Sequence, residues 1–416
     1  MLTRQPLALL AAALLACSRA APPAPVAPPA PVAPPAAVAP PPHVASPADA
    51  LDERRLVLEL RQALADARRH SDTARFRAIE VSSAAALAQH PRSRQLKHVR
   101  AAALLALGRV RDALPLIKNL YDSDAKDLVA AGLYSDASFA TGDVPAAVLA
   151  AERMMGIAPG LPAYARAAQL RFATGDVDGS LQMWREAFNA GHQSDPEGLA
   201  FCATNTGDVQ LFAKGQLKEA RASYDIALAA VPTYPGARIG RARLQLAEGQ
   251  ATKALADLDA IEAPAHDAES VSLHTVVLTS LGRAPAAAAV RDQLLALADR
   301  SPRDAALALA THSLELPRAQ ELALASQRDG GGPLDDDVTA FVLARAGDTA
   351  AALPLAKRAV ALGSQDARVL ARAGLVLAAA GDPGARALLE RALAKTRHFD
   401  PLLLPQVDAA LAALPR

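Results

Sequence analysis

A short segment near residue 270 carries residue types suited to metal or acid–base chemistry. His266, Ser270 and His274 follow one another at intervals of four residues, with Glu269 between them. Such spacing would place their side chains on one face of a helix. His266, however, is expected at a boundary between helices and His274 within one, which favours solvated or capping roles. We therefore predict no metal site here.

Two further groups could bind an ion or act as a nucleophile. Residues 335–337 are three aspartates that follow three glycines and a proline. They indicate a loop leading into a helix N-terminus, where acids are favoured, whereas a calcium loop would need alternating ligands and a turn glycine among them. Cys202 is expected to be a buried, inert thiol. With no zinc-ligand spacing, phosphate-binding glycine motif or nucleophile elbow in the sequence, we predict a non-enzyme without metal or cofactor.

Composition narrows the class of protein further. The 416 residues include 44 Lys plus Arg and 43 Asp plus Glu, so the formal net charge of +1 gives no general attraction to nucleic acid. Two cysteines cannot form a disulfide framework. Hydrophobic residues make up 51% and aromatic residues only 3%, and this alanine- and leucine-rich composition favours closely packed helices. We predict no nucleic-acid partner and an all-α fold.

The N-terminus has the features of a targeting segment. Arg4 supplies a positive charge, residues 7–16 form an uninterrupted apolar run, and Cys17 follows. The run is too short to span a bilayer and is typical of a secretory signal peptide, which we assign to residues 1–16.

The tetrapeptide Leu14-Leu15-Ala16-Cys17 resembles the lipobox of bacterial lipoproteins. The resemblance implies cleavage before Cys17 and acylation of that residue, and several acyl chains make a stable anchor. Ser18, rather than an aspartate, follows the cysteine, and the resemblance then implies the outer membrane, on its periplasmic side. The alternative is an ordinary secreted protein with an incidental cysteine.

A proline-rich spacer comes next. Residues 21–47 contain twelve prolines, and most of the others are alanine or valine. Proline removes backbone donors and biases the residue before it toward extended geometry, so we predict a polyproline II linker over residues 17–47. A ligand for a proline-binding groove is the alternative.

From residue 48 to 416 one sequence pattern recurs: a helix-like run, a glycine, and a small residue five positions later. The recurring glycines are Gly108, Gly142, Gly175, Gly215, Gly249, Gly282, Gly347 and Gly381. They are 34, 33, 40, 34, 33, 65 and 34 residues apart, and the interval of 65 contains a turn without glycine near Leu316-Pro317. Glycine can end a helix in the left-handed conformation, and the aspartate that follows several of these glycines can cap the next helix.

The unit that begins Gly215-Gln216-Leu217-Lys218-Glu219-Ala220 and continues with Tyr224, Ala227 and Pro232 resembles the tetratricopeptide repeat. The resemblance implies an all-α, right-handed superhelical solenoid of about ten helix–turn–helix units over residues 48–416. Most units lack the terminal proline, and residues 195–214 carry about six extra residues that lengthen a helix or form a loop.

In tetratricopeptide proteins the concave groove, lined by the first helices, usually holds a peptide or a partner's helix. Counting back three, six or ten positions from each turn glycine gives the expected groove residues Phe139, Phe172, Phe212, Gln169, Asn205 and Arg243. The three phenylalanines are read either as an apolar stripe for a partner or as ordinary core between helices.

These features predict a membrane-anchored tetratricopeptide lipoprotein that acts as a non-catalytic interaction scaffold or assembly factor for unidentified envelope proteins. The alternatives are a groove that binds a small apolar ligand or glycan, and the accessory arm of a cell-wall enzyme. An enzyme would need a separate catalytic domain, and only about 35 residues follow Gly381.

Overall fold

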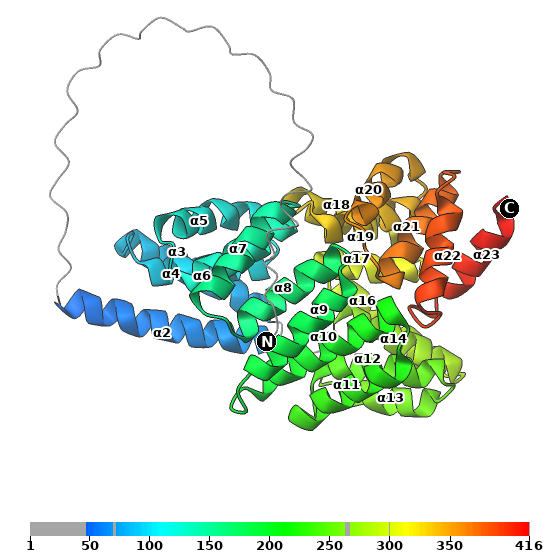
Figure 1. The fold of residues 1–416 in the computed structure, drawn as a ribbon, viewed down its shortest axis with the longest axis horizontal. Coiled ribbons are helices and arrows are strands. Elements are labelled where there is room, and N and C mark those ends of the chain that lie inside the picture. Colours follow the sequence, from blue (N-terminus) through cyan, green and yellow to red (C-terminus); the bar gives the residue numbers. More distant parts are fainter. Residues whose placement is uncertain (1–46, 70–71, 263–266, 299, 416) are drawn as a thin grey trace, which may run out of the picture. The chain divides into compact units, whose positions relative to one another are not determined.

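The computed structural model describes residues 47–69, 72–262, 267–298 and 300–415. Within these ranges the secondary structure is helical, without β-strands (Figure 1). Cys17, the leader and the spacer up to residue 46 lie outside them. Contacts divide the chain into Met1–Arg55 and Leu56–Arg416, and the solenoid is the second unit. No helix in the described ranges combines the length and apolar character needed to cross a bilayer.

The solenoid is a succession of helix pairs joined by short turns. The pairs are α4 (Arg94–Ala106) and α5 (Val110–Ser123), α6 (Leu128–Ala140) and α7 (Val144–Ile157), α8 (Leu161–Ala173) and α9 (Val177–Ala190), α10 (Pro196–Lys214) and α11 (Leu217–Ala230), α12 (Pro235–Ala247) and α13 (Ala251–Asp259), α14 (Ala268–Ser280) and α15 (Ala284–Arg291), α17 (Pro302–Thr311) and α18 (Leu316–Asp329), α19 (Pro333–Arg345) and α20 (Thr349–Ala361), and α21 (Ala367–Ala379) and α22 (Ala385–Lys395). Helices α2 (Pro47–Arg69) and α3 (Thr73–Gln89) precede them, α16 (Gln293–Ala296) is a short helix before α17, and α23 (Leu404–Ala413) follows them. The expected all-α solenoid is confirmed.

The turn chemistry is as predicted. All eight turn glycines separate the two helices of a pair, with φ between 63° and 94°. Asp143, Asp176 and Asp348 each accept a hydrogen bond of 2.9–3.1 Å from the backbone N–H three residues on. The glycine therefore ends one helix and the aspartate caps the next.

Small residues five positions after the turn glycines let the paired helices pack closely. They are at most 5% exposed: Ala113, Ala147, Ser180, Ala220, Ala254, Ala287 and Ala352. Arg386 occupies the same position in the last pair, and its guanidinium donates to the carbonyls of Leu411 (3.2 Å), Leu414 (2.8 Å) and Pro415 (3.0 Å) instead.

The turn without glycine lies between α17 and α18, directly before Leu316. Ser313 (φ 55°) and Glu315 (φ 40°) adopt the positive φ that glycine has in the other turns. The six extra residues near 195–214 lengthen a helix, because α10 has 19 residues where α8 and α12 have 13.

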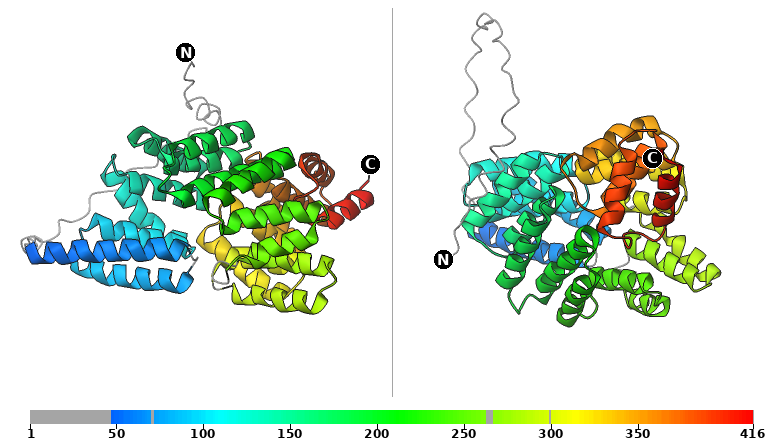
Figure 2. Two further views of the ribbon diagram at one scale, coloured as in Figure 1. Left: turned by 90° about the horizontal axis from the view of Figure 1, so that it is seen from below. Right: turned by 45° about the vertical axis from the view of Figure 1, so that its right-hand side comes forward.

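The C-terminal repeats lie against the turns of α6, α8 and α10 (Figure 2). The Gly332 N–H donates to the Ala140 carbonyl at 3.0 Å. A Cβ at Gly175 would be only 2.3 Å from the Gly363 oxygen, and one at Gly215 only 2.2 Å from the Lys395 oxygen. Along this stretch the chain itself covers the predicted groove.

Candidate functional site

Three of the six predicted groove residues meet at one cavity inside the solenoid. Phe139 at the end of α6, together with Gln169 and Phe172 on α8, lines a cavity of about 310 Å³. Gln169 is exposed and both phenylalanines are partly buried. Phe139 and Phe172 hold the same position in successive repeats, and Gln169 lies three residues before Phe172 on α8.

The opposite wall of this cavity comes from α19 and α21, far along the sequence. Leu334 and Val369 contribute apolar surface, and Asp337 and Asp366 contribute carboxylates. Leu334 is 47% exposed, unusual for a leucine on an inner wall. The cavity therefore pairs aromatic and aliphatic surface with a polar end, a combination typical of ligand pockets.

Phe212 does not line this cavity. Its side chain is fully buried, and its ring lies beneath two guanidinium groups, Arg368 at 3.7 Å and Arg243 at 5.3 Å from the ring centroid. These are cation–π distances. Phe212 thus holds α10 against α12 and α21, and a partner could not reach it without opening the solenoid.

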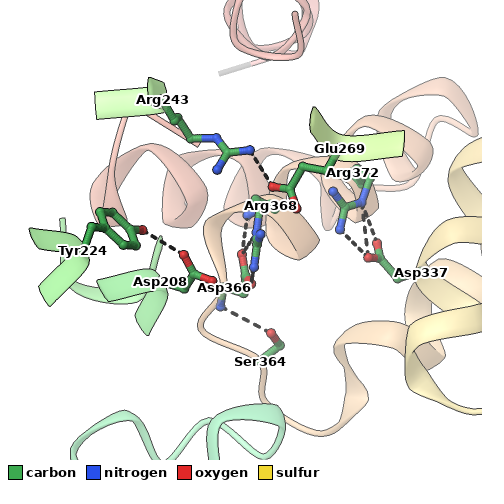
Figure 3. A network of polar contacts seen from close by, with 9 residues as sticks. All are labelled: Asp208, Tyr224, Arg243, Glu269, Asp337, Ser364, Asp366, Arg368 and Arg372. Atoms are coloured by element: carbon green, nitrogen blue, oxygen red, sulfur yellow. Dashed lines mark hydrogen bonds and ion pairs between the residues drawn. The ribbon is translucent and has the colours of Figure 1, made fainter. Parts of the chain in front are cut away.

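A network of buried charges joins these helices (Figure 3). Arg368 and Arg372 are four residues apart and lie on the same face of α21. The Arg368 guanidinium donates three hydrogen bonds of 2.8, 3.1 and 3.3 Å to the Asp366 carboxylate, and the Arg372 Nε donates to the Asp337 Oδ1 at 3.0 Å. Asp366 also caps α21, accepting the Arg368 backbone N–H at 2.8 Å.

The environment shifts the pKa values of Asp337 and Asp366 in opposite directions. Burial raises the pKa of Asp337, and its ion pair with Arg372 opposes this only in part. Burial also acts to raise the pKa of Asp366, but Arg368 outweighs it and the net pKa is lowered. Asp366 is therefore a firmly ionised partner for Arg368.

The same network continues to Asp208 and Tyr224. The Tyr224 hydroxyl donates to the Asp208 Oδ1 at 2.8 Å. Burial raises the pKa of Asp208 to about 6, against the opposing charge of Arg368. Gly207 and Gly240 make room for the tyrosine ring, since a Cβ at either position would lie within 2.6 Å of it.

A second cavity, of about 270 Å³, adjoins the first, since Leu334, Asp337, Asp366 and Val369 line both. Arg243 lines it and forms a 2.6 Å ion pair with Glu269. The side chain of Glu269 is 49% exposed, so solvent reaches this interior pair. Burial acts to raise the pKa of Glu269, but Arg243 and Arg368 outweigh it and lower the net value.

The remaining candidates have structural roles. The Asn205 amide donates to the Phe201 carbonyl of its own helix at 2.9 Å. Burial raises the pKa of the Cys202 thiol to about 12, which makes it a poor nucleophile. His274 pairs with Asp259 at 3.2 Å, and Ser270 forms a capping box with Asp267.

His266 lies outside the described residues. The three aspartates at 335–337 begin α19 as predicted, and each has a partner: Ser326, Arg358 and Arg372 respectively. Among the described residues no group of histidine, cysteine and acidic side chains is arranged to hold a metal ion.

Sequence reasoning did not find the charge network. Three of its members stood out in the sequence: Asp208 occupies a repeat position where most other units have a small residue, Arg243 was an expected groove residue, and Asp337 belongs to the run of three aspartates. Arg368 also meets groups on α10 and α14, which come from repeats that are not adjacent in sequence, so the repeat period could not predict these interactions. Its direct partner Asp366 is two residues away, and the partner of Arg372, Asp337, belongs to the preceding helix pair.

Residues 211–275 match the family model of the tetratricopeptide repeat. No curated protein sequence matches the chain. Among solved structures, the chain is similar to PilF of Pseudomonas aeruginosa (16% identity, TM-score 0.40, covering 48% of this chain and 90% of that one). It is also similar to PilW, described as a widely conserved type IV pilus biogenesis factor (21% identity, TM-score 0.39, 48% and 91%). A third is a tetratricopeptide repeat protein from Parabacteroides merdae (16% identity, TM-score 0.33, 61% and 98%).

These structural likenesses are distant and concern the fold. The family match, by contrast, includes α11, α12 and α13, whose glycine turns and small residues recur in the other helix pairs. Residues 211–275 are therefore similar to the tetratricopeptide repeat, and the other helix pairs extend the same helix-pair architecture to both sides.

Proposed function

We propose that the chain is a non-catalytic scaffold that holds partner proteins in the bacterial cell envelope, anchored there through a lipid on Cys17. The observation that carries the proposal is the cavity of about 310 Å³, where Phe139, Gln169 and Phe172 of successive repeats remain available to a ligand. The tetratricopeptide match supports it, because stacked helix pairs present extended binding surfaces.

The size of the cavity limits how a partner enters. A space of about 310 Å³ takes one or two side chains, not a whole helix. An aromatic or aliphatic side chain of the partner would pack on Phe139 and Phe172, in the manner of an interface anchor. The Gln169 amide is placed to hydrogen-bond the partner's backbone at the mouth.

Site-specific photo-cross-linking tests this role. A photoreactive phenylalanine analogue replaces Gln169 in the full chain, or Leu149, an exposed residue on the second helix α7, as the control. In cells, one protein adduct should form at 169 and not at 149. Adding Phe139→Ala and Phe172→Ala should abolish it, with helicity by circular dichroism unchanged.

The same experiment separates the alternatives. Equal adducts at both positions, or none at 169, would contradict a protein-binding cavity. A cavity of this volume is also within the range of small-molecule sites. A ligand-dependent rise in melting temperature that Phe139→Ala removes, without any adduct at 169, would favour a small apolar ligand.

The proposed lipid anchor on Cys17 is tested by a separate experiment. Cells fed an alkyne-labelled fatty acid should incorporate the label into the native chain and into Cys202→Ser, but not into Cys17→Ser. The Cys17→Ser chain should also leave the membrane fraction. Label retained in Cys17→Ser would contradict the anchor while leaving the scaffold role open to the cross-linking test.

A further inference from the structure

A third cavity lies where the segment between α22 and α23 meets α11 and α12. Its volume is about 560 Å³, compared with about 310 Å³ for the cavity beside Phe139, and the two have no lining residue in common. Small-molecule sites typically have volumes of about 300–1,000 Å³. This third cavity therefore has room for a whole small molecule.

One part of its wall is apolar. Leu217 at the start of α11, Leu246 near the end of α12 and Leu404 at the start of α23 line it, together with Ala247 and Pro401. The three leucines are only partly buried. A hydrocarbon chain that covered them would remove apolar surface from water, which favours binding.

The ionisable residues that line the cavity are all basic. No aspartate or glutamate is among them, and they are Arg243, Lys395, Arg397 and His398. Two of the four have acidic partners outside the cavity wall: Arg243 pairs with Glu269 at 2.6 Å, and Arg397 pairs with Asp408 at 2.6 Å. The Arg243 Nε is nevertheless buried without a hydrogen-bond partner among the described residues.

Lys395 and His398 are the cationic and polar groups left over. Within the part of the chain that the structure describes, neither side chain forms an ion pair or a hydrogen bond. The His398 backbone N–H donates to the Thr396 hydroxyl at 3.0 Å, which fixes this segment at the end of α22. An ammonium and an imidazole at one cavity can both donate hydrogen bonds to the same anionic group.

We propose that this cavity binds a small organic anion, namely a carboxylate or phosphate attached to an apolar chain. The chain packs on Leu217, Leu246 and Leu404, and the anionic group binds Lys395 and His398. This site goes beyond the scaffold function proposed above and does not depend on it.

Calorimetric titration tests the ligand chemistry. The full chain with Cys17→Ser, purified without detergent, is titrated with decanoate and with decyl phosphate below their micelle concentrations. At least one of the two should bind at one equivalent, and the tighter one identifies the preferred anionic group. Decanol, which lacks the charge, and butyrate, which lacks the long chain, should bind at least tenfold more weakly. Equal binding of decanol, or no saturable binding of either long-chain anion, would overturn the proposal.

The basic side chains are tested by a matched pair of double variants. Lys395→Gln with His398→Gln should weaken binding of the long-chain anion about five- to tenfold, as expected for two partly exposed contacts. Lys126→Gln with His192→Gln removes the same residue types at exposed positions away from the cavity and should have no effect. Equal affinities of the two double variants would refute the assigned contacts.

The apolar part is tested by filling the cavity. Ala247 is exposed on α12 and lines the cavity, so Ala247→Trp should occupy the space without disturbing the core and should abolish binding. Ala222→Trp adds the same ring on the exposed side of α11 and should leave binding intact. Undiminished binding by a folded Ala247→Trp chain would place the ligand elsewhere.

Hydrogen exchange locates the ligand without any substitution in the cavity. Decanoate or decyl phosphate should slow exchange of residues 395–404 and of the end of α12, because the ligand bridges them. Protection near Phe139 and Phe172 instead would assign the ligand to the other cavity and contradict this proposal. The adduct at residue 169 is unaffected in either case, so failure here leaves the scaffold function standing, and loss of that adduct leaves this site standing.

Discussion

In the folded chain, the Asp208 carboxyl group keeps its proton to a higher pH than an exposed aspartate does. Burial raises its pKa to about 6, compared with about 4 for an exposed aspartate. The folded state therefore binds this proton more tightly than the unfolded state does. By linkage, the stabilisation is complete below about pH 4 and is lost as the pH rises through about 6.

The variant Asp208→Asn should make this visible. Asparagine does not titrate but can still accept the Tyr224 hydroxyl. The free energy of unfolding of the native chain, minus that of the variant, should fall by about 2–3 kcal/mol between pH 4 and pH 7, measured by urea unfolding. Asp292→Asn, at an exposed carboxylate, is the control. A difference for Asp208→Asn that is flat with pH would refute the assigned shift.

Glu315 has a strained backbone conformation at the turn between α17 and α18. Its φ of 40° and ψ of 47° are left-handed, which costs a residue with a Cβ about 1–2 kcal/mol. Glu315→Gly should therefore stabilise the chain by about 1 kcal/mol in thermal unfolding. Ala380→Gly, where φ is −87°, should destabilise it by about 0.5–1 kcal/mol. Destabilisation by Glu315→Gly would show that the glutamate side chain contributes more than its backbone strain removes.

At the scale of the helices, sequence reasoning succeeded because the relevant interactions are local. A turn glycine, the aspartate after it and the small residue five positions on act within one helix pair, and the structure has them in the predicted places. The turn without glycine was also placed correctly. The extra residues of α10 could not be assigned beforehand, because nothing in them breaks a helix and nothing requires one.

Ala220 tests the packing of one pair. It is fully buried on α11, and its position is small in nearly every repeat. Ala220→Leu should lower the free energy of unfolding by about 1–3 kcal/mol through overpacking. Ala222→Leu, two residues along on the exposed side of the same helix, should change it little. Equal stability of the two variants would show that α10 and α11 can separate without cost.

At the scale of the molecule, sequence reasoning failed, because a repeat period describes neighbours and not distant turns. Phe139, Phe172 and Phe212 hold one repeat position, yet the first two line a cavity and the third is buried under Arg368. Small rotations between repeats accumulate until the C-terminal repeats reach α6, α8 and α10. No single unit encodes that meeting, so the interactions of Arg368 on α21 with Asp208 on α10 and Glu269 on α14 could not be predicted from the repeat period.

Gly175 and Gly249 separate the local role of a turn glycine from this long-range one. Both have positive φ, 84° and 74°, so alanine at either site should cost about 1–2 kcal/mol of stability. Only at 175 would the added Cβ meet another repeat, 2.3 Å from the Gly363 oxygen, while Gly249 has nothing within 4 Å.

Gly175→Ala should therefore lower the free energy of unfolding by about 1–3 kcal/mol more than Gly249→Ala does, because the added Cβ overpacks the contact with Gly363. Hydrogen exchange of the residues near 363 should speed up in Gly175→Ala alone. Equal losses, with exchange near 363 unchanged in both, would mean that the C-terminal repeats yield to the added methyl group. The solenoid would then open at little cost, and partners could enter its interior from this side as well.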